Sequence, residues 1–85
     1  MASSFNEDLV QGLIDSCRNE LVALLPNSSI PLYRVPGAFE IPVCAEYVLN
    51  HTGCDVVIAL GVVIQGETAH ADIIARTVAT QLAEL

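Results

Sequence analysis

The chain has 85 residues, of which 53% are hydrophobic and 15% charged, and its net charge is −7. This length allows at most one domain, and the apolar composition excludes a disordered segment. Because the only strong bases are three arginines, nucleic acid and anionic membrane surfaces are excluded as favoured partners. A small domain on its own should have a mostly polar surface, so we expect some of this apolar surface to be covered by further chain or by another subunit.

The first element in the chain is a helix that we predict to begin at Asn6. Asn6 is a helix-capping residue type, and the acids Glu7 and Asp8 suit the positive end of a helix dipole. Apolar residues then recur at helical spacing and predict one buried face, made of Leu9, Val10, Leu13, Ile14, Cys17, Leu21, Leu24 and Leu25. Pro26 and the polar residues after it end this helix.

Two strands alternate with two further helices. We predict strands at 30–35 and 54–61, and the second is a continuous apolar run typical of a strand buried on both faces. A helix led by Pro42 and covering 43–50 lies between them, closed by Gly53. A last helix begins at about Ala69, with Ile74, Val78, Leu82 and Leu85 on one face.

The element order helix–strand–helix–strand–helix indicates a layered α/β fold with parallel strands. Two strands do not make a stable parallel sheet, because such sheets need several strands covered on both faces. We therefore expect residues 1–85 to be one incomplete domain, with the strand ahead of Phe5 and the C-terminal half missing. The absence of a basic and apolar leader before Phe5 predicts a cytoplasmic protein.

Cysteine usage gives no sign of a metal site or a disulfide framework. Cys17, Cys44 and Cys54 are odd in number and form no Cys-x-x-Cys pair. We expect these thiols to be reduced and buried. His51 follows the second helix, and we expect it to be solvated in a turn.

The turn at 65–70 is a candidate binding site, because open α/β sheets bind ligands where strands end and helices begin. Gly66 permits close approach of the backbone, and Thr68 can cap the helix or donate its hydroxyl. His70, expected in the first turn of the last helix, could accept and return protons near neutral pH. An ordinary helix cap with a surface histidine explains the same residues, so the turn alone does not distinguish a binding site from a helix start.

Two other segments should lie at the same sheet edge if the strands are parallel. In 35–42, Glu40 could accept hydrogen bonds from ligand hydroxyls or complement a helix dipole, while Phe39 is expected in the core. Phe5 could pack as a hydrophobic staple or stack on a flat ring. The convergence of the three loops is what favours a binding function.

Together these segments resemble the three signatures of the lumazine synthase family. The segments are 5–7, 35–42 and 59–70, in the family's order and spacing. The resemblance implies the N-terminal half of a flavodoxin-like three-layer α/β/α domain. It also implies a place in riboflavin biosynthesis: 5-amino-6-ribitylamino-pyrimidinedione condenses with 3,4-dihydroxy-2-butanone 4-phosphate to 6,7-dimethyl-8-ribityllumazine, releasing phosphate and water, without metal or organic cofactor.

The resemblance assigns a role to each matching position. Phe5 would stack on the pyrimidine, and Ala38 and Glu40 would hold the ribityl chain, with Phe39 between them at the substrate. Backbone groups of Val63 and Ile64 would bind the pyrimidine edge. The remaining members of the site are at the last turn, where the N–H groups of Gly66, Glu67 and Thr68 would hold phosphate and His70 would shuttle protons.

The resemblance further implies a homo-oligomer built on pentamers with sites between subunits, and riboflavin synthase as a candidate partner. Gln65 departs from the arginine that many relatives carry, which weakens the local positive field. Family chains also continue well beyond Leu85. Two alternatives therefore stay open: a non-catalytic truncated or split fragment that acts as an assembly piece, and an unrelated flavodoxin-like module for a phosphorylated ligand.

Overall fold

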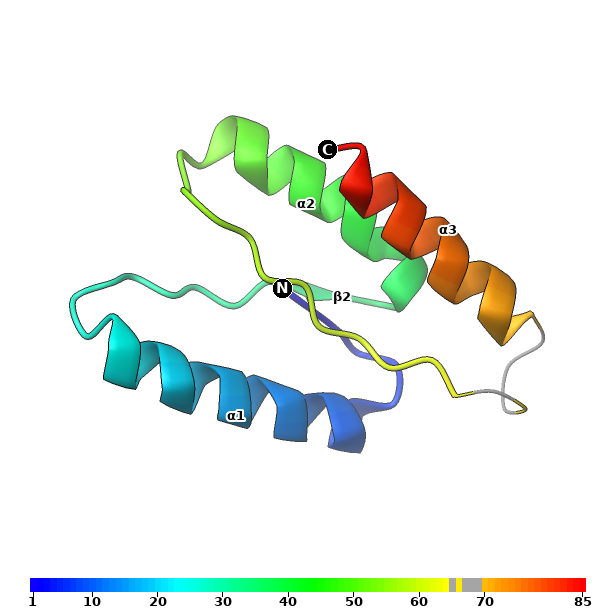
Figure 1. Cartoon of the computed structure of the whole chain (residues 1–85), viewed down its shortest axis with the longest axis horizontal. Coiled ribbons are helices and arrows are strands. Elements are labelled where there is room, and N and C mark those ends of the chain that lie inside the picture. The colour runs from blue at the N-terminus through cyan, green and yellow to red at the C-terminus, as the bar shows by residue number, and fades with distance from the viewer. Residues whose placement is uncertain (65, 67–69) are drawn as a thin grey trace.

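A computed structural model describes residues 1–64, 66 and 70–85. In chain order the elements are β1 (Ala2–Ser3), α1 (Glu7–Leu24), β2 (Arg34–Val35), the 3-10 helix η1 (Ala38–Glu40), α2 (Ile41–His51) and α3 (Ala71–Ala83). Figure 1 shows α1 on one side of the central extended segments and α2 with α3 on the other side. The layered α/β arrangement predicted from the sequence is confirmed.

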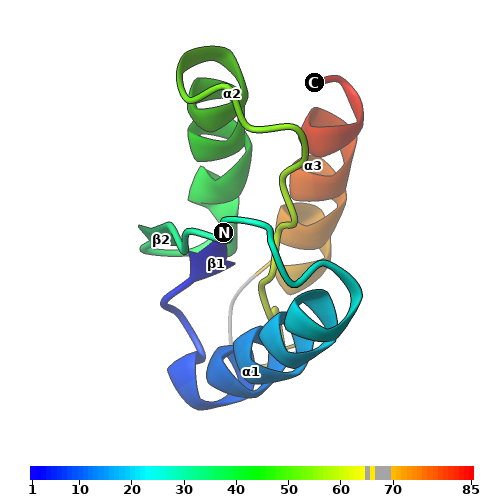
Figure 2. The same cartoon turned by 90° about the vertical axis from the view of Figure 1, so that its left-hand side faces the viewer.

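The small sheet is parallel, and β1 lies at its centre (Figure 2). β1 pairs with β2 in the register Ala2 to Arg34 and Ser3 to Val35. On its other side a parallel bridge joins Ala2 to Leu60. The N–H of Ser3 donates to the carbonyl of Leu60 at 3.1 Å, which ties the two segments together.

The prediction that the strand ahead of Phe5 is missing is wrong, because Ala2 and Ser3 form that strand. Both residues are fully buried, at 0% exposure. Small side chains have no marked strand preference, so nothing local indicates this strand. Pairing with neighbours on both sides creates it.

Both predicted strands are shorter than expected. The first is regular only at Arg34–Val35, and 54–61 pairs as a strand only at Leu60. A ladder needs partners residue by residue, and the two-residue β1 offers few of them. The length of these strands is therefore set by their neighbour and not by their own composition.

Helix α1 has the predicted bounds but buries only part of its apolar face. Val10 and Ile14 are buried against Ala2, while Leu9 is 54% and Leu24 is 67% exposed. The helix ends where Pro26 follows, with the N–H of Leu25 bonded to the carbonyl of Leu21. The uncovered leucines agree with the expectation that this chain has apolar surface for another partner to cover.

The second and third helices pack on the opposite face of the sheet. The core there consists of Met1, Val35, Ile41, Ala45 and Val48, with Leu82 of α3 packed against it. Gly53 closes α2 with a φ of 69°, a left-handed conformation that favours glycine. Within the described parts of the chain, none of the helices has the combination of length and apolar character that crossing a membrane requires.

Candidate active site

The three predicted loops meet at the carboxyl edge of the sheet. The side-chain Nδ2 of Asn6 donates to the carbonyl oxygen of Val62 at 3.0 Å, which joins the first loop to the third. A Cβ placed on Gly61 would lie 3.6 Å from the Cβ of Ala38 and 3.5 Å from the Oγ of Ser3. The second loop therefore contacts the start of the third, and the three segments form one surface.

In the first loop, Phe5 is 54% exposed and its ring is accessible. Asn6 adopts a left-handed backbone conformation, with φ 58° and ψ 48°, which asparagine tolerates better than most residues. Its side chain makes no hydrogen bond to the helix N-terminus, so the prediction of a side-chain cap is wrong. The amide instead bonds across to the third loop because the left-handed turn directs it there.

The second loop is the 3-10 helix η1. Ala38 is half-buried beside Gly61, and Glu40 is exposed at the end of η1. Phe39 is 51% exposed, so the expectation that it lies in the core is wrong. The tight 3-10 turn, closed by the N–H of Glu40 bonded to the carbonyl of Gly37 at 3.1 Å, turns Phe39 outward.

The third loop continues the edge of the sheet. Val63 and Ile64 are half-buried, and Ile64 lines a hollow of about 310 Å³ with Asn6 and the first residues of α1. Gly66 is exposed, with a φ of 93°. The predicted site residues Glu67 and Thr68, together with Gln65 and Ala69, lie outside the described residues.

His70 lies at the cap of α3 and not in its first turn as predicted. Its backbone is left-handed, with φ 64°, and its carbonyl accepts the N–H of Ile74 at 3.0 Å. The side chain is exposed at the end of the third loop. His51, by contrast, is the last residue of α2 and stacks on Tyr47 with ring centroids 4.3 Å apart, so it is exposed as predicted but is not in a turn.

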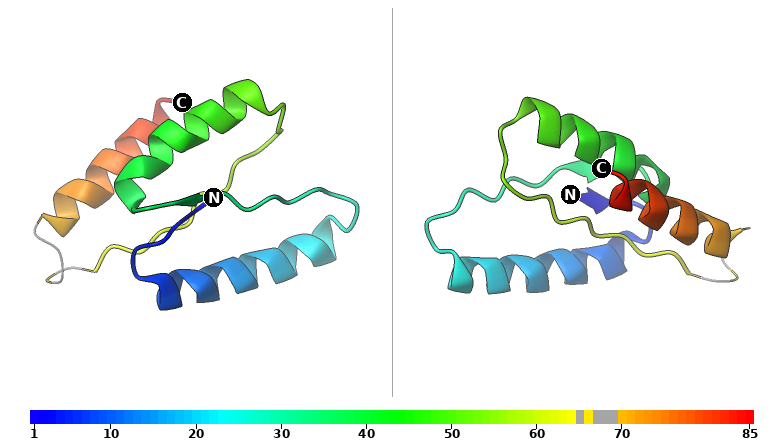
Figure 3. Two further views of the ribbon diagram at one scale, coloured as in Figure 1. Left: turned by 180° about the vertical axis from the view of Figure 1, so that it is seen from behind. Right: turned by 45° about the horizontal axis from the view of Figure 1, so that its top comes forward.

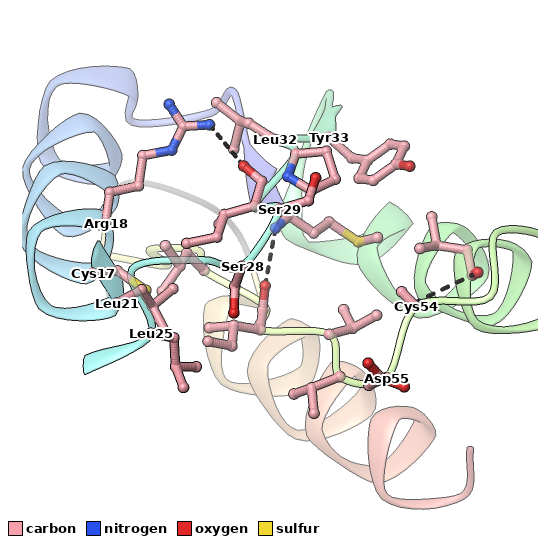
Figure 4. A pocket seen from close by; sticks show the side chains of 18 of the residues that line it. Cys17, Arg18, Leu21, Leu25, Ser28, Ser29, Leu32, Tyr33, Cys54 and Asp55 are labelled. Carbon is pink, nitrogen blue, oxygen red and sulfur yellow. Dashed lines mark hydrogen bonds between the residues drawn. The ribbon is translucent and has the colours of Figure 1, made fainter. Parts of the chain in front are cut away.

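A larger cavity, of about 630 Å³, lies between α1 and the segment 54–60 (Figure 4). Leu21 of α1 and Leu25, directly after α1, line it, and Cys17 and Cys54 lie on its wall as free, half-buried thiols. The Nη2 of Arg18 bonds to the carbonyl of Ile30 at 3.3 Å at its rim. The lining contains none of the predicted site residues, so this cavity is separate from the three-loop site.

Comparison with known proteins gives one consistent result. The family model described as 6,7-dimethyl-8-ribityllumazine synthase matches residues 1–85. The chain belongs to the 6,7-dimethyl-8-ribityllumazine synthase family. Proteins of that name are 43% identical over 82 residues in Nitrosomonas europaea, 40% over 73 residues in Paracidovorax citrulli and 35% over 85 residues in Limosilactobacillus reuteri.

These lumazine synthase matches cover 95%, 85% and 100% of the chain but only 50%, 47% and 55% of the relatives. The chain thus spans about half the length of the curated relatives that it matches. No solved structure matches it significantly.

Two features of the three-loop surface went unpredicted. The contact between Asn6 and Val62 was missed because capping is the commoner role of asparagine ahead of a helix. The second feature is the hydroxyl of Ser3, which is buried beneath Gly61 without a partner among the described residues. It was missed because the strand that contains Ser3 was not predicted. Neither has a signal in the local sequence.

Proposed function

We propose that this chain supplies one side of a lumazine synthase active site in riboflavin biosynthesis. The reaction is the condensation of 5-amino-6-ribitylamino-pyrimidinedione with 3,4-dihydroxy-2-butanone 4-phosphate to 6,7-dimethyl-8-ribityllumazine. The observation that carries the proposal is the convergence of the three loops, joined by the Asn6–Val62 hydrogen bond and by the packing of Ala38 at Gly61. Family membership supports small-molecule substrates of this kind.

The proposed roles follow the shape of this surface. The exposed ring of Phe5 stacks on the pyrimidine, and backbone groups of Val63 and Ile64 bind its edge. Ala38, Phe39 and Glu40 form the wall for the ribityl chain, where the exposed Glu40 carboxylate accepts hydrogen bonds from its hydroxyls.

The phosphate and the proton transfers belong to the third loop. We assign phosphate to the N–H groups of Gly66, Glu67 and Thr68, which precede α3 in the chain, because the positive end of that helix dipole favours an anion nearby. His70, exposed beside this loop, takes and returns protons as the amine attacks the ketone, the imine forms, phosphate leaves and the ring closes. Because the substrates carry much of the reactivity, the site contributes mainly proximity and proton transfer.

The other side of the site belongs, in this proposal, to the half of the family's length that the chain does not span. We further propose a flavodoxin-like domain, completed by that half, that assembles into pentamers in the cytoplasm with sites between subunits and with riboflavin synthase as a partner. Exposed apolar residues on α2 support burial against a neighbour: Val43 is 73% and Tyr47 is 61% exposed.

The test is formation of the lumazine chromophore, measured on the chain alone and on the chain mixed with the uncovered half of the Nitrosomonas europaea relative. We expect negligible product from the chain alone and measurable product from the mixture. In the mixture, His70→Gln should lower kcat by roughly 10²-fold or more. The matched control His51→Gln, an exposed histidine remote from the three loops, should leave kcat unchanged. Equal effects of the two substitutions, or robust turnover by the chain alone, would contradict this proposal.

A non-catalytic assembly piece is the second candidate. It is favoured by the half-length match and by the exposed leucines of α1. In that case the chain would co-purify with an intact synthase without adding turnover, whereas a phosphate-binding module of another kind would bind its ligand equally well after His70→Gln. Turnover that depends on His70 separates the synthase from both.

A further inference from the structure

Gly61 is a glycine that the fold of the described chain does not require. It lies at the carboxyl edge of the sheet, directly after the bridge at Leu60, and it is exposed. Glycine is favoured where φ is positive, as at Gly53 and Gly66, but Gly61 has no positive φ. The backbone conformation at this position therefore accepts an alanine.

Steric crowding does not require a glycine at position 61 either. A Cβ on Gly61 would lie 3.5 Å from the Cδ1 of Ile41, 3.5 Å from the Oγ of Ser3 and 3.6 Å from the Cβ of Ala38, which are ordinary contact distances. All three of these closest atoms belong to side chains, so the chain's own backbone does not crowd this position. An added methyl group would rest on Ser3 and Ile41 and gain an apolar contact with Ala38.

Alanine should thus be the more stable residue at position 61. Replacing glycine by alanine in a compatible conformation raises the folding equilibrium constant by roughly two- to fivefold, because the unfolded glycine chain has more conformational freedom to lose. Where neither conformation nor packing requires a glycine in a sheet, the close approach of a ligand is a common reason for it. Stability is often given up at functional sites in this way.

The surroundings of Gly61 favour one part of the proposed substrates. In both views of Figure 3, α1, α2 and α3 begin at the same end of the molecule, and the yellow chain leaves the sheet toward that end. Ala38 beside Gly61 offers an apolar contact, and Glu40 of the same 3-10 helix offers an exposed carboxylate. A neutral carbon chain with hydroxyls suits this pair, because its carbons contact the methyl group and its hydroxyls donate to the carboxylate. A phosphate does not suit it, because the carboxylate repels an anion.

We infer that Gly61 is a specificity-determining residue of the proposed lumazine synthase site, and that the ribityl chain of the pyrimidine substrate passes over its bare backbone beside Ala38. The inference rests on the proposed function and adds a residue to it. A side chain at position 61 would occupy the space of the ribityl chain. It would leave the pyrimidine ring in place, because the proposed function assigns that ring to Phe5.

Two pyrimidinedione ligands test this assignment. Both lack the 5-amino group and cannot react: 6-ribitylamino-pyrimidinedione carries the ribityl chain, and 6-methylamino-pyrimidinedione carries a methyl group in its place. Isothermal titration calorimetry measures their binding to the chain combined with the uncovered half of the Nitrosomonas europaea relative. Gly61→Ala should weaken binding of the ribityl ligand by roughly tenfold, because one added carbon in a fitted site has about this effect. Binding of the methylamino ligand should remain as in the parent.

The stability of the chain alone gives an independent measurement. In urea denaturation, Gly61→Ala should raise the folding equilibrium constant by roughly two- to fivefold. Gly12→Ala is the matched control, because a Cβ on Gly12 of α1 would meet no atom of the described residues within 4 Å beyond its own helix backbone. This control should give a similar gain in stability and leave the binding of both ligands unchanged.

A double variant tests the contact between the second and third loops. Gly61→Ala combined with Ala38→Gly adds a methyl group on one side and removes the facing methyl group on the other side. Because the two Cβ positions are 3.6 Å apart, this exchange should restore part of the space for the ribityl chain. The double variant should therefore bind the ribityl ligand more tightly than Gly61→Ala does.

Several results would overturn the inference. A Gly61→Ala chain less stable than the parent would show that the fold requires this glycine. Equal effects on the two ligands, or a double variant that binds no better than Gly61→Ala, would show that the ribityl chain does not pass over Gly61. Weaker binding of the added half, with ligand binding unchanged, would assign Gly61 to packing between the halves. These results leave the proposed function standing, whereas a parent complex that binds neither ligand would contradict the proposed function and the inference with it.

Discussion

Asn6 joins the first loop to the third, so its replacement measures what holds the candidate site together. Two properties of the residue matter: its Nδ2 donates to the Val62 carbonyl at 3.0 Å, and its backbone is left-handed at φ 58°. Asn6→Gly removes the donor but accepts the backbone conformation. Asn6→Ala removes the donor and also places a Cβ in a conformation that alanine disfavours.

The expected losses differ between the two variants. Losing a net hydrogen bond costs about 0.5–1.5 kcal/mol, so Asn6→Gly should lower the free energy of unfolding by about 1 kcal/mol. Compared with glycine, an alanine in the left-handed conformation costs roughly 1–2 kcal/mol. About 0.5–1 kcal/mol of this difference is offset, because glycine loses more chain entropy on folding than alanine does. Asn6→Ala should therefore lower the free energy of unfolding by about 2 kcal/mol.

Urea denaturation followed by circular dichroism measures these values, and amide chemical shifts from NMR locate the change. The amide of Val63 shares a peptide unit with the Val62 carbonyl, so its nitrogen chemical shift should change in both variants when that carbonyl loses its hydrogen-bond donor. Asn6→Asp serves as a control that keeps the left-handed preference but replaces the donor with a carboxylate oxygen, and it should behave no better than Asn6→Gly. Parent-like stability of both variants, or a glycine variant less stable than the alanine variant, would refute the reasoning.

Two further predictions concern the centre of the sheet. Ser3→Ala removes a buried hydroxyl without a partner among the described residues, so it should raise the free energy of unfolding in urea denaturation by about 1 kcal/mol. The control Ser4→Ala, at an exposed neighbouring residue, should change this free energy by less than about 0.5 kcal/mol. A less stable Ser3→Ala would mean that the hydroxyl has a partner. Desolvation by burial lowers the pKa of the Met1 amino group in the folded chain below its ordinary value of 8.0. Between the lowered pKa and about 8.0 the unfolded chain binds more protons than the folded chain, so the free energy of unfolding should rise with pH in this window and level off above it. Chain synthesised with an acetylated Met1 lacks this group and should lose that part of the pH dependence; identical pH profiles for the two forms would contradict the prediction.

Much of the candidate site could be predicted because its residues carry local signals. Gly66 marks a positive-φ turn, and Phe5 precedes a recognisable helix start. Motif order then placed three loops at one sheet edge, provided that the strands were parallel. The Asn6–Val62 hydrogen bond and the exposure of Phe39 could not be predicted, since both depend on turn geometry that many sequences share.

The sequence by itself determined the helices, because apolar periodicity and the prolines and glycines at their ends act within a few residues along the chain. It also determined the family and the position of the three loops in chain order. Only the tertiary structure decided the strands: Ala2 and Ser3 have no strand pattern, yet they occupy the centre of the sheet because the segments on either side offer backbone partners. A strand is a property of pairing between residues that are distant along the chain, and the local sequence does not specify that pairing.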